Sequence, residues 1–150
     1  MKRTRQRIFV ALAIVIVFGL ASGATSDLQR TTEPDQERPS KPFKLRAAGQ
    51  IDLDTGAIVF GGVATHLGLY TANGFLTPGF NIFGTIEAAN RDTLDFTAVF
   101  SIGPLGEIQA SFNFAGGTGR FADAVGTASG PVTLDPEFTF LITASGHLDY

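Results

Sequence analysis

The chain of 150 residues contains no cysteine, no tryptophan and a single methionine. Without cysteine there are no disulfides, no thiolate nucleophiles and no cysteine-ligated metal or iron–sulfur sites. Charged residues make up only 17% of the chain, whereas 44% is hydrophobic and 14 residues are phenylalanine. This composition excludes disorder along the whole chain. The length allows one ordinary domain, whose stability must come from a packed, aromatic-rich core.

The N-terminal segment has the pattern of a secretory signal peptide. Four basic residues between positions 2 and 7 precede an unbroken apolar run at 8–21, and the small residues 22–24 follow. The apolar run is shorter than the roughly 20 residues that a membrane-spanning helix needs. We therefore expect 1–24 to be a cleaved signal peptide, with an uncleaved membrane tether as the alternative.

Cleavage at this position would make the mature chain strongly acidic. Residues 1–24 hold four basic residues and no acidic ones, so 7 Lys and Arg remain against 14 Asp and Glu, a formal charge of −7. Nucleic acid is a poor partner for such a chain, because duplex binding depends on cations that neutralise phosphates. We expect a secreted or periplasmic protein that has no nucleic-acid partner and no stable membrane span after cleavage.

Residues 25–42 separate this segment from the rest of the chain. They contain one large apolar side chain, Leu28, among charged residues, Pro, Ser and Thr. Such a stretch cannot bury enough apolar surface to offset the entropy lost on ordering. We expect 25–42 to be a disordered linker and 43–150 to be the folded domain.

From residue 43 onwards, apolar residues recur at every second position. Leu94, Phe96 and Ala98 share one face, for example, while Asp95 and Thr97 lie opposite. This alternation is typical of half-buried strands, and no comparable segment has the spacing of an amphipathic helix. The predicted strands are 43–53, 57–65, 67–76, 80–89, 93–102, 106–114, 121–134 and 137–149.

The spacing of these strands predicts an all-β fold, either a barrel or a sandwich. Turn-forming residues separate most of them, at 54–56, 77–79, 90–92 and 103–106, and Asn73-Gly74 gives a further turn signal. We favour an eight-stranded antiparallel closed β-barrel, because closure removes exposed edges. The interior of such a barrel can be filled by side chains or can hold one small ligand.

One segment carries a resemblance to a known family. Gly116-Gly117-Thr118-Gly119-Arg120-Phe121, followed by a glycine-containing strand, resembles the corresponding segment of plant dirigent proteins and allene oxide cyclase-like barrels. Ala64–Gly68 is similar to a segment of secreted bacterial members of that group. Over residues 43–150 the resemblance implies an eight-stranded antiparallel barrel with an apolar cavity, and a homotrimer as in the plant members. We interpret 116–121 as a structural turn that allows left-handed backbone, with Arg120 and Phe121 beginning the next strand.

The resemblance also implies a class of ligand. Dirigent proteins orient phenoxy radicals, and the cyclase folds an unsaturated fatty-acid epoxide. We therefore expect a protein that binds or scaffolds a hydrophobic small molecule in its barrel. One alternative is a cyclase or stereocontrolling protein, in which Glu87, Asp95 or His66 steers a reactive intermediate and Arg120 neutralises a carboxylate. The other is a structural envelope protein. No catalytic residue is carried over, since sharing a fold does not transfer an activity, and whether the protein is an enzyme stays open.

The candidate ligand-binding residues combine polar groups with aromatic rings. Each has a structural alternative: an arginine can hold a turn or a carboxylate, a histidine can be a hydrogen-bonded barrel residue, and phenylalanines can simply fill the core. The candidates are His66, Tyr70, Arg120, Phe96, Phe112, Phe138 and Phe140.

Three further patterns point to cofactors or catalysis but are incomplete, so we expect no cofactor and no metal site. The G-x-G-x-x-A pattern at 117–122 is not followed by the helix that a dinucleotide site requires. Residues 52–56 resemble the start of a calcium loop but lack the rest of it, so a hairpin turn is the better interpretation. Ser145, His147 and Asp149 alternate on one strand, too far apart for a catalytic triad.

Overall fold

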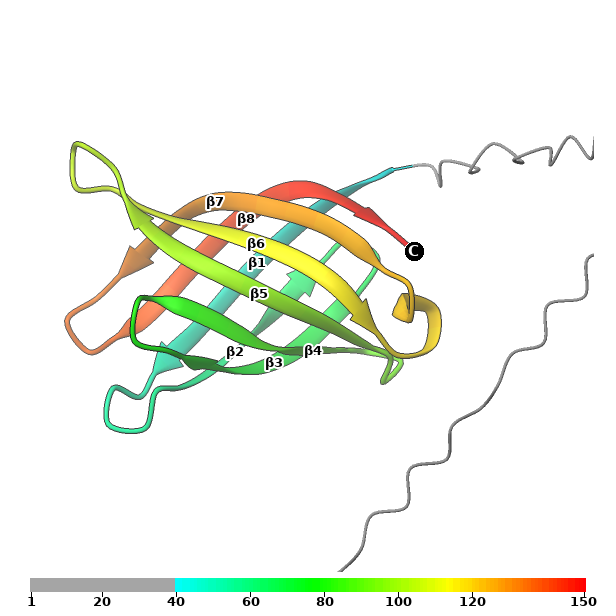
Figure 1. Cartoon of the computed structure of the whole chain (residues 1–150), viewed down its shortest axis with the longest axis horizontal. Coiled ribbons are helices and arrows are strands. Elements are labelled where there is room, and N and C mark those ends of the chain that lie inside the picture. Colours follow the sequence, from blue (N-terminus) through cyan, green and yellow to red (C-terminus); the bar gives the residue numbers. More distant parts are fainter. Residues whose placement is uncertain (1–39) are drawn as a thin grey trace, which may run out of the picture. The chain divides into compact units, whose positions relative to one another are not determined.

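The computed structural model describes residues 40–150. The expected signal peptide (1–24) and residues 25–39 of the expected linker lie outside this range. Within it, the chain forms a closed antiparallel β-barrel (Figure 1) in which strands follow one another in chain order. The elements are β1 (Lys41–Ile51), β2 (Ala57–Ala64), β3 (Gly68–Leu76), β4 (Asn81–Ala88), β5 (Thr93–Ile102), β6 (Ile108–Gly117), the 3₁₀ turn η1 (Gly119–Phe121), β7 (Val125–Leu134) and β8 (Thr139–Asp149).

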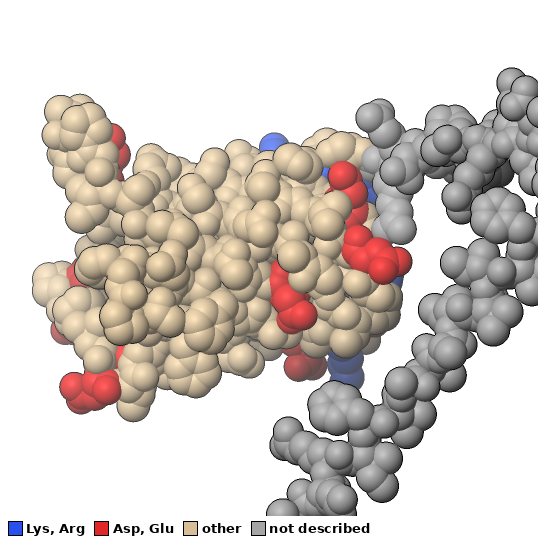
Figure 2. All heavy atoms as spheres, viewed as in Figure 1, with Lys and Arg blue, Asp and Glu red and all other residues tan. Residues whose placement is uncertain are grey.

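The predicted all-β class and the eight-stranded closed barrel are confirmed. The barrel closes where β1 pairs with β8, with Leu45 opposite Ala144 and Ala47 opposite Ile142. The first strand begins at Lys41, two residues before the predicted start. In residues 40–150, no helix is long and apolar enough to cross a membrane. Figure 2 shows a barrel wall made largely of uncharged residues.

Aromatic rings fill the middle of the barrel. Phe60 lies at the centre of a ring cluster, with ring centroids 5.6 Å from Phe96, 6.0 Å from Phe140 and 6.3 Å from Tyr70. Such edge-on and tilted contacts are the favourable geometries for aromatic pairs. These contacts fill the barrel axis at this level with aromatic side chains.

Three strand glycines show why so many glycines occur inside the strands. A Cβ atom added to Gly49 would lie 2.4 Å from the Cβ of Phe60 and 2.6 Å from the ring of Phe140. Gly74 lies opposite Gly84, where an added Cβ would be 2.6 Å from the Gly74 Cα atom. The turn signal at Asn73-Gly74 was therefore wrong: this glycine lies inside β3 and allows two backbones to approach closely.

Residues 116–124, which comprise the end of β6 and the connection to β7, close one end of the barrel. The three glycines within 116–119 adopt positive φ angles of 80°, 151° and 57°, as the predicted left-handed turn requires. The expectation that Arg120 and Phe121 begin the next strand is wrong, because η1 intervenes and β7 begins only at Val125. Phe121 is fully buried, and its ring centroid lies 5.1 Å from that of Tyr150. Its side chain therefore acts as a plug.

We predict that Phe121→Ala removes this plug and lowers the free energy of unfolding by about 3–5 kcal/mol, because the substitution leaves a cavity among packed rings. Phe83→Ala is the matched control: Phe83 is half-exposed on the outer wall of β4, and its loss should cost less than about 1 kcal/mol. Urea unfolding of both variants checks this, and equal losses would contradict the role of Phe121 as a plug.

Candidate functional site: an apolar mouth

The two ends of the barrel differ in construction. We call the end with the β1–β2, β3–β4, β5–β6 and β7–β8 turns the mouth; it lies at the left of Figure 1. The opposite end, which we call the closed end, carries the β2–β3 and β4–β5 turns, η1 and the C-terminal residue Tyr150. The plug at Phe121 covers only the closed end.

A cavity of about 220 Å³ lies inside the mouth. Every residue that lines it is aliphatic or aromatic, so no acid, base, hydroxyl or amide side chain faces it. Three of these residues belong to turns, and the others lie at or near the strand ends. The lining consists of Ile51, Leu53, Leu76, Phe80, Phe100, Ile102, Ile108, Val132, Leu134, Phe138 and Phe140.

Large apolar side chains at the rim of this cavity face solvent. Ile102 is 76% exposed and Phe80 66%. Leu105, at the tip of the β5–β6 turn, is 94% exposed. Single exposed apolar residues are normal, whereas a group of them around an apolar cavity is a feature of surfaces that bind ligands or partners.

Two phenylalanines at the mouth adopt strained backbone conformations. Phe80 and Phe138 have φ angles of 63° and 60°, a left-handed region that costs a bulky residue about 1–2 kcal/mol. Both occupy the fourth position of a turn, where the amide donates to the carbonyl three residues earlier at 3.0–3.1 Å. The β5–β6 turn has the same hydrogen bond, and there the position is taken by Gly106, with φ 83°. Glycine would remove the strain, although the β4–β5 turn at the closed end also has a residue other than glycine at this position, Arg91 with φ 69°.

The predicted ligand-binding residues fall into three separate groups. Phe138 and Phe140 line the mouth cavity. Phe96 and Phe112 lie deeper, as a buried pair with ring centroids 5.9 Å apart. The polar candidates are elsewhere: His66 and Arg120 belong to the closed end, and Tyr70 lies on β3 close to it.

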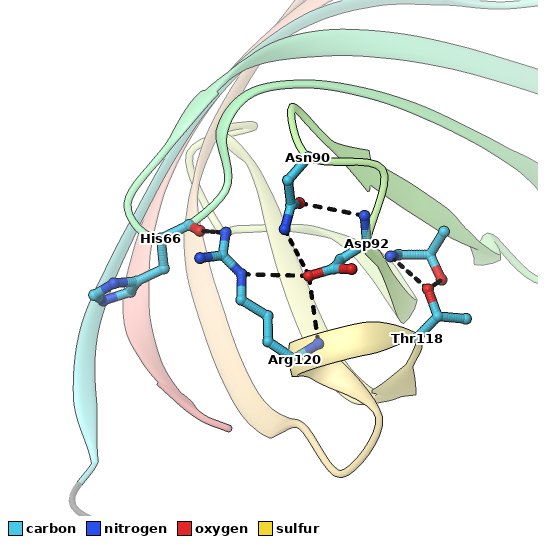
Figure 3. Close-up of polar contacts among 6 residues, drawn as sticks. His66, Asn90, Asp92, Thr118 and Arg120 are labelled. Carbon is cyan, nitrogen blue, oxygen red and sulfur yellow. Dashed lines mark hydrogen bonds and ion pairs between the residues drawn. The ribbon is translucent and has the colours of Figure 1, made fainter.

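Arg120 fastens the plug at the closed end (Figure 3). Its guanidinium group donates a hydrogen bond from Nη2 to the carbonyl oxygen of His66. Nε lies 3.8 Å from Oδ2 of Asp92, and the Arg120 backbone amide donates to the same oxygen at 3.3 Å. The guanidinium carbon lies 4.8 Å from the centre of the Phe121 ring. These contacts join η1 to the β2–β3 and β4–β5 turns, as the structural alternative for this arginine expects.

Neighbouring polar residues complete the same closed-end network. Asn90 donates from Nδ2 to Asp92 Oδ2 at 2.6 Å, and its own side-chain oxygen accepts from the Asp92 amide at 3.2 Å. The Thr118 hydroxyl accepts from the Thr93 amide at 2.9 Å. Asp92 thus compensates the charge of Arg120, and the hydrogen bonds of Asn90 hold Asp92 in place.

His66 and Tyr70 also contact backbone groups. His66 has a φ angle of 72°, and its Nε2 atom lies 3.1 Å from the carbonyl oxygen of Pro42, so Nε2 carries the proton that is donated. The Tyr70 hydroxyl donates to the Arg46 carbonyl at 3.2 Å. Burial of the Tyr70 ring raises the pKa of its hydroxyl, because desolvation disfavours the phenolate.

The aspartate-containing segment at 52–56 forms a hairpin turn, as expected. Oδ1 of Asp52 accepts from the amides of Asp54 at 2.9 Å and Thr55 at 3.3 Å. Hydrogen bonds from the Thr55 side chain and from these amides hold the pKa of the Asp52 carboxyl below its usual value. In the part of the chain that the structure describes, no group of three or more His, Asp or Glu residues could hold a metal ion.

Sequence reasoning identified two of the residues that line the mouth and missed the others. One usable signal was present: the turns Pro78-Gly79-Phe80 and Pro136-Glu137-Phe138 both end in phenylalanine where a turn favours glycine. The remaining lining residues lie at strand ends, and only the order and register of the strands place those ends together.

Comparison with known proteins does not assign the site. No family model, no curated protein and no solved structure matches the chain.

The buried hydroxyl of Tyr70 predicts an alkaline loss of stability. An unfolded tyrosine has a pKa of about 10, and the folded pKa is raised. The neutral Tyr70 hydroxyl therefore contributes its full stabilisation of the fold below pH ~10. This contribution is lost as the pH rises from there towards the folded pKa. Tyr70→Phe should be less stable by about 1 kcal/mol near neutral pH, because the bond to Arg46 is lost. It should also lose less stability on transfer to pH ~11.

Urea unfolding near pH 7 and pH 11 measures both effects. Tyr150→Phe, which changes the other tyrosine of the chain, is the control. An identical pH dependence in the wild type and Tyr70→Phe would contradict the assignment of the alkaline effect to Tyr70.

Proposed function

We propose that the protein binds an apolar small molecule in the mouth of its barrel. The observation that carries this proposal is the unfilled cavity of about 220 Å³, whose lining is entirely aliphatic and aromatic. Burial of apolar ligand surface there would be favourable by about 25 cal/mol per Å². Ligand pockets usually measure about 300–1,000 Å³, so this cavity takes one ring or a short hydrocarbon segment, with the rest of the ligand at the rim.

The strained backbone conformations of Phe80 and Phe138 support the same proposal. Strained residues persist where the surrounding structure or a function maintains them, and they gather at ligand sites. Both rings line the cavity although glycine would suit the backbone better. A role in contacting a ligand would explain why phenylalanine occupies both positions despite its cost in stability.

Binding is better supported than chemistry at this site. General acid–base or nucleophilic catalysis requires a titratable or nucleophilic group within hydrogen-bond reach of the substrate, and the cavity lining has none. Of the groups named for the cyclase alternative, His66 and Arg120 contact other residues at the closed end. Asp95 accepts a hydrogen bond from Thr85 on the exposed wall at 2.9 Å.

We further infer that the barrel is related to the allene oxide cyclase-like and dirigent-like group and that it acts after export. The motif at 116–121 and the eight-strand closure support the kinship, and the order of basic, apolar and small residues in 1–24 supports the export. A homotrimer is the assembly that this kinship implies. The role as a structural envelope protein is the outcome if no apolar ligand binds.

Fluorescence titration with N-phenyl-1-naphthylamine, an uncharged apolar probe, tests the proposed function. Phe80→Gly and Phe138→Gly should each weaken binding by about tenfold, because part of the apolar lining is lost. Their free energies of unfolding should change by no more than about 1 kcal/mol, because relief of the left-handed strain offsets the lost contacts.

Phe75→Ala is the matched control for these two variants. Phe75 is 54% exposed, close to the 66% of Phe80, but it lies on the outer wall of β3 and does not line the cavity. It should leave probe binding unchanged. Failure of the wild type to bind the probe, or equal effects of all three substitutions, would overturn the proposal.

A further inference from the structure

The charged residues of the barrel are distributed unequally between its two ends. The half that contains the mouth comprises residues 47–61, 72–85, 98–112 and 130–143. It carries five carboxylates and no Lys or Arg. The other half of residues 40–150 carries five carboxylates and five Lys or Arg. Figure 2 shows the same distribution on the face that it presents: acidic but no basic residues at the left-hand end.

All five carboxylates of this half belong to turns at the mouth. Asp52 and Asp54 lie in the β1–β2 turn, Glu107 in the β5–β6 turn, and Asp135 and Glu137 in the β7–β8 turn. The same three turns contribute Leu53, Leu105 and Phe138 to the apolar rim or lining. Negative charge and exposed apolar surface are therefore interleaved around one opening.

Backbone hydrogen bonds hold three of these carboxylates at the mouth. Besides Asp52, whose contacts are described above, Asp135 accepts from the amides of Glu137 at 2.9 Å and Thr139 at 2.8 Å. Glu107 accepts from the amide of Leu105 at 3.0 Å. These bonds compensate no charge, since an amide is neutral. Among residues 40–150 the structure shows no hydrogen bond or ion pair to the carboxylates of Asp54 or Glu137.

The resulting field determines which ligands the mouth favours. Several like charges around an apolar opening create a negative potential that attracts cations and repels anions. Arg120, the group that a carboxylate ligand would have used, is at the closed end and already contacts Asp92. An anionic amphiphile whose tail entered the mouth would therefore place its head group among carboxylates with no cation beside it.

We propose that the mouth binds a cationic amphiphile, with its hydrocarbon part in the apolar cavity and its positive head group among the carboxylates of Asp52, Asp54, Glu107, Asp135 and Glu137. This inference rests on the proposed function, which requires only an apolar ligand. It adds the charge of the ligand, and it separates this protein from a barrel that holds a fatty-acid carboxylate.

Displacement of N-phenyl-1-naphthylamine by three ligands of equal chain length tests the charge preference. Decyltrimethylammonium, decanol and decanoate should displace the probe in that order of affinity. At low ionic strength the ammonium compound should bind about tenfold more tightly than decanoate. The difference should shrink in about 1 M NaCl, where screening acts over roughly 3 Å.

Two double variants test whether the preference for the ammonium compound comes from the carboxylates at the mouth. Asp54→Asn combined with Glu137→Gln removes two unpaired carboxylates at the mouth and should reduce the preference for the ammonium compound by about threefold. Glu87→Gln combined with Asp95→Asn is the matched control. It changes the net charge equally, but on the wall of β4 and β5 in the other half, and it should leave the preference unchanged.

The possible results separate the two proposals. If the probe binds but the three ligands displace it equally, or decanoate displaces it best, the cationic preference is overturned while apolar binding stands. If the two double variants behave alike, the preference does not come from the mouth and this inference fails. If neither the probe nor any of the three ligands binds, the proposed function itself is overturned.

Discussion

Packing of phenylalanine rings inside an eight-stranded barrel is the constraint on which the other features depend. A closed barrel of eight strands has an interior just wide enough for side chains. The positions of the largest rings therefore decide where space is left. Phe60 and its neighbours fill the middle of the barrel, and Phe121 fills the closed end. At the mouth, the side chains that line the barrel leave a cavity. The position of the candidate site therefore follows from how the rings are distributed along the barrel axis.

The closed end shows how polar residues serve this packing. Phe121 can plug the barrel only if η1 is held over its end, and Arg120 holds it through the carbonyl of His66 and the carboxylate of Asp92. Histidine, arginine and aspartate side by side suggest a reactive site when seen in isolation. Their contacts instead join three turns of the chain. The polar side chains at the closed end therefore contact turn residues and backbone groups, and the mouth has an apolar lining with charge only in its turns.

The strands could be predicted from the sequence because period-two alternation is a local property. Segments such as 93–102 identify their own inner face, and eight of them at short spacing are consistent with a barrel or a sandwich, of which closure favours the barrel. The turn motifs were harder to interpret. Asn73-Gly74 has the composition of a hairpin turn, but Gly74 is required inside a strand by the close approach of Gly84. In the same way, Phe121 looks like the start of a strand but becomes a plug, because the preceding glycines redirect the chain.

The site could be predicted only in part, for a different physical reason. Phe138 and Phe140 were identified as aromatic residues of the last strand, whereas Ile51, Ile102 and Val132 were not, since nothing local distinguishes them from core residues. Their shared feature is position at one end of the barrel, and this depends on the register of non-adjacent segments. The separation of charge between the two ends is hidden for the same reason: along the chain the acidic turns alternate with segments that belong to the other end.

The central claim is that the mouth, and no other surface of the barrel, receives an apolar ligand. Methyl-resolved NMR measures this most directly, because the mouth and the closed end both carry isoleucine, leucine or valine. On addition of an uncharged apolar ligand, the account predicts chemical-shift changes in the methyl groups of Ile102, Val132 and Leu134. The methyl groups of Leu45 and Leu67 should not change. Changes centred on the closed end or the outer wall, or no change at saturating ligand, would contradict it.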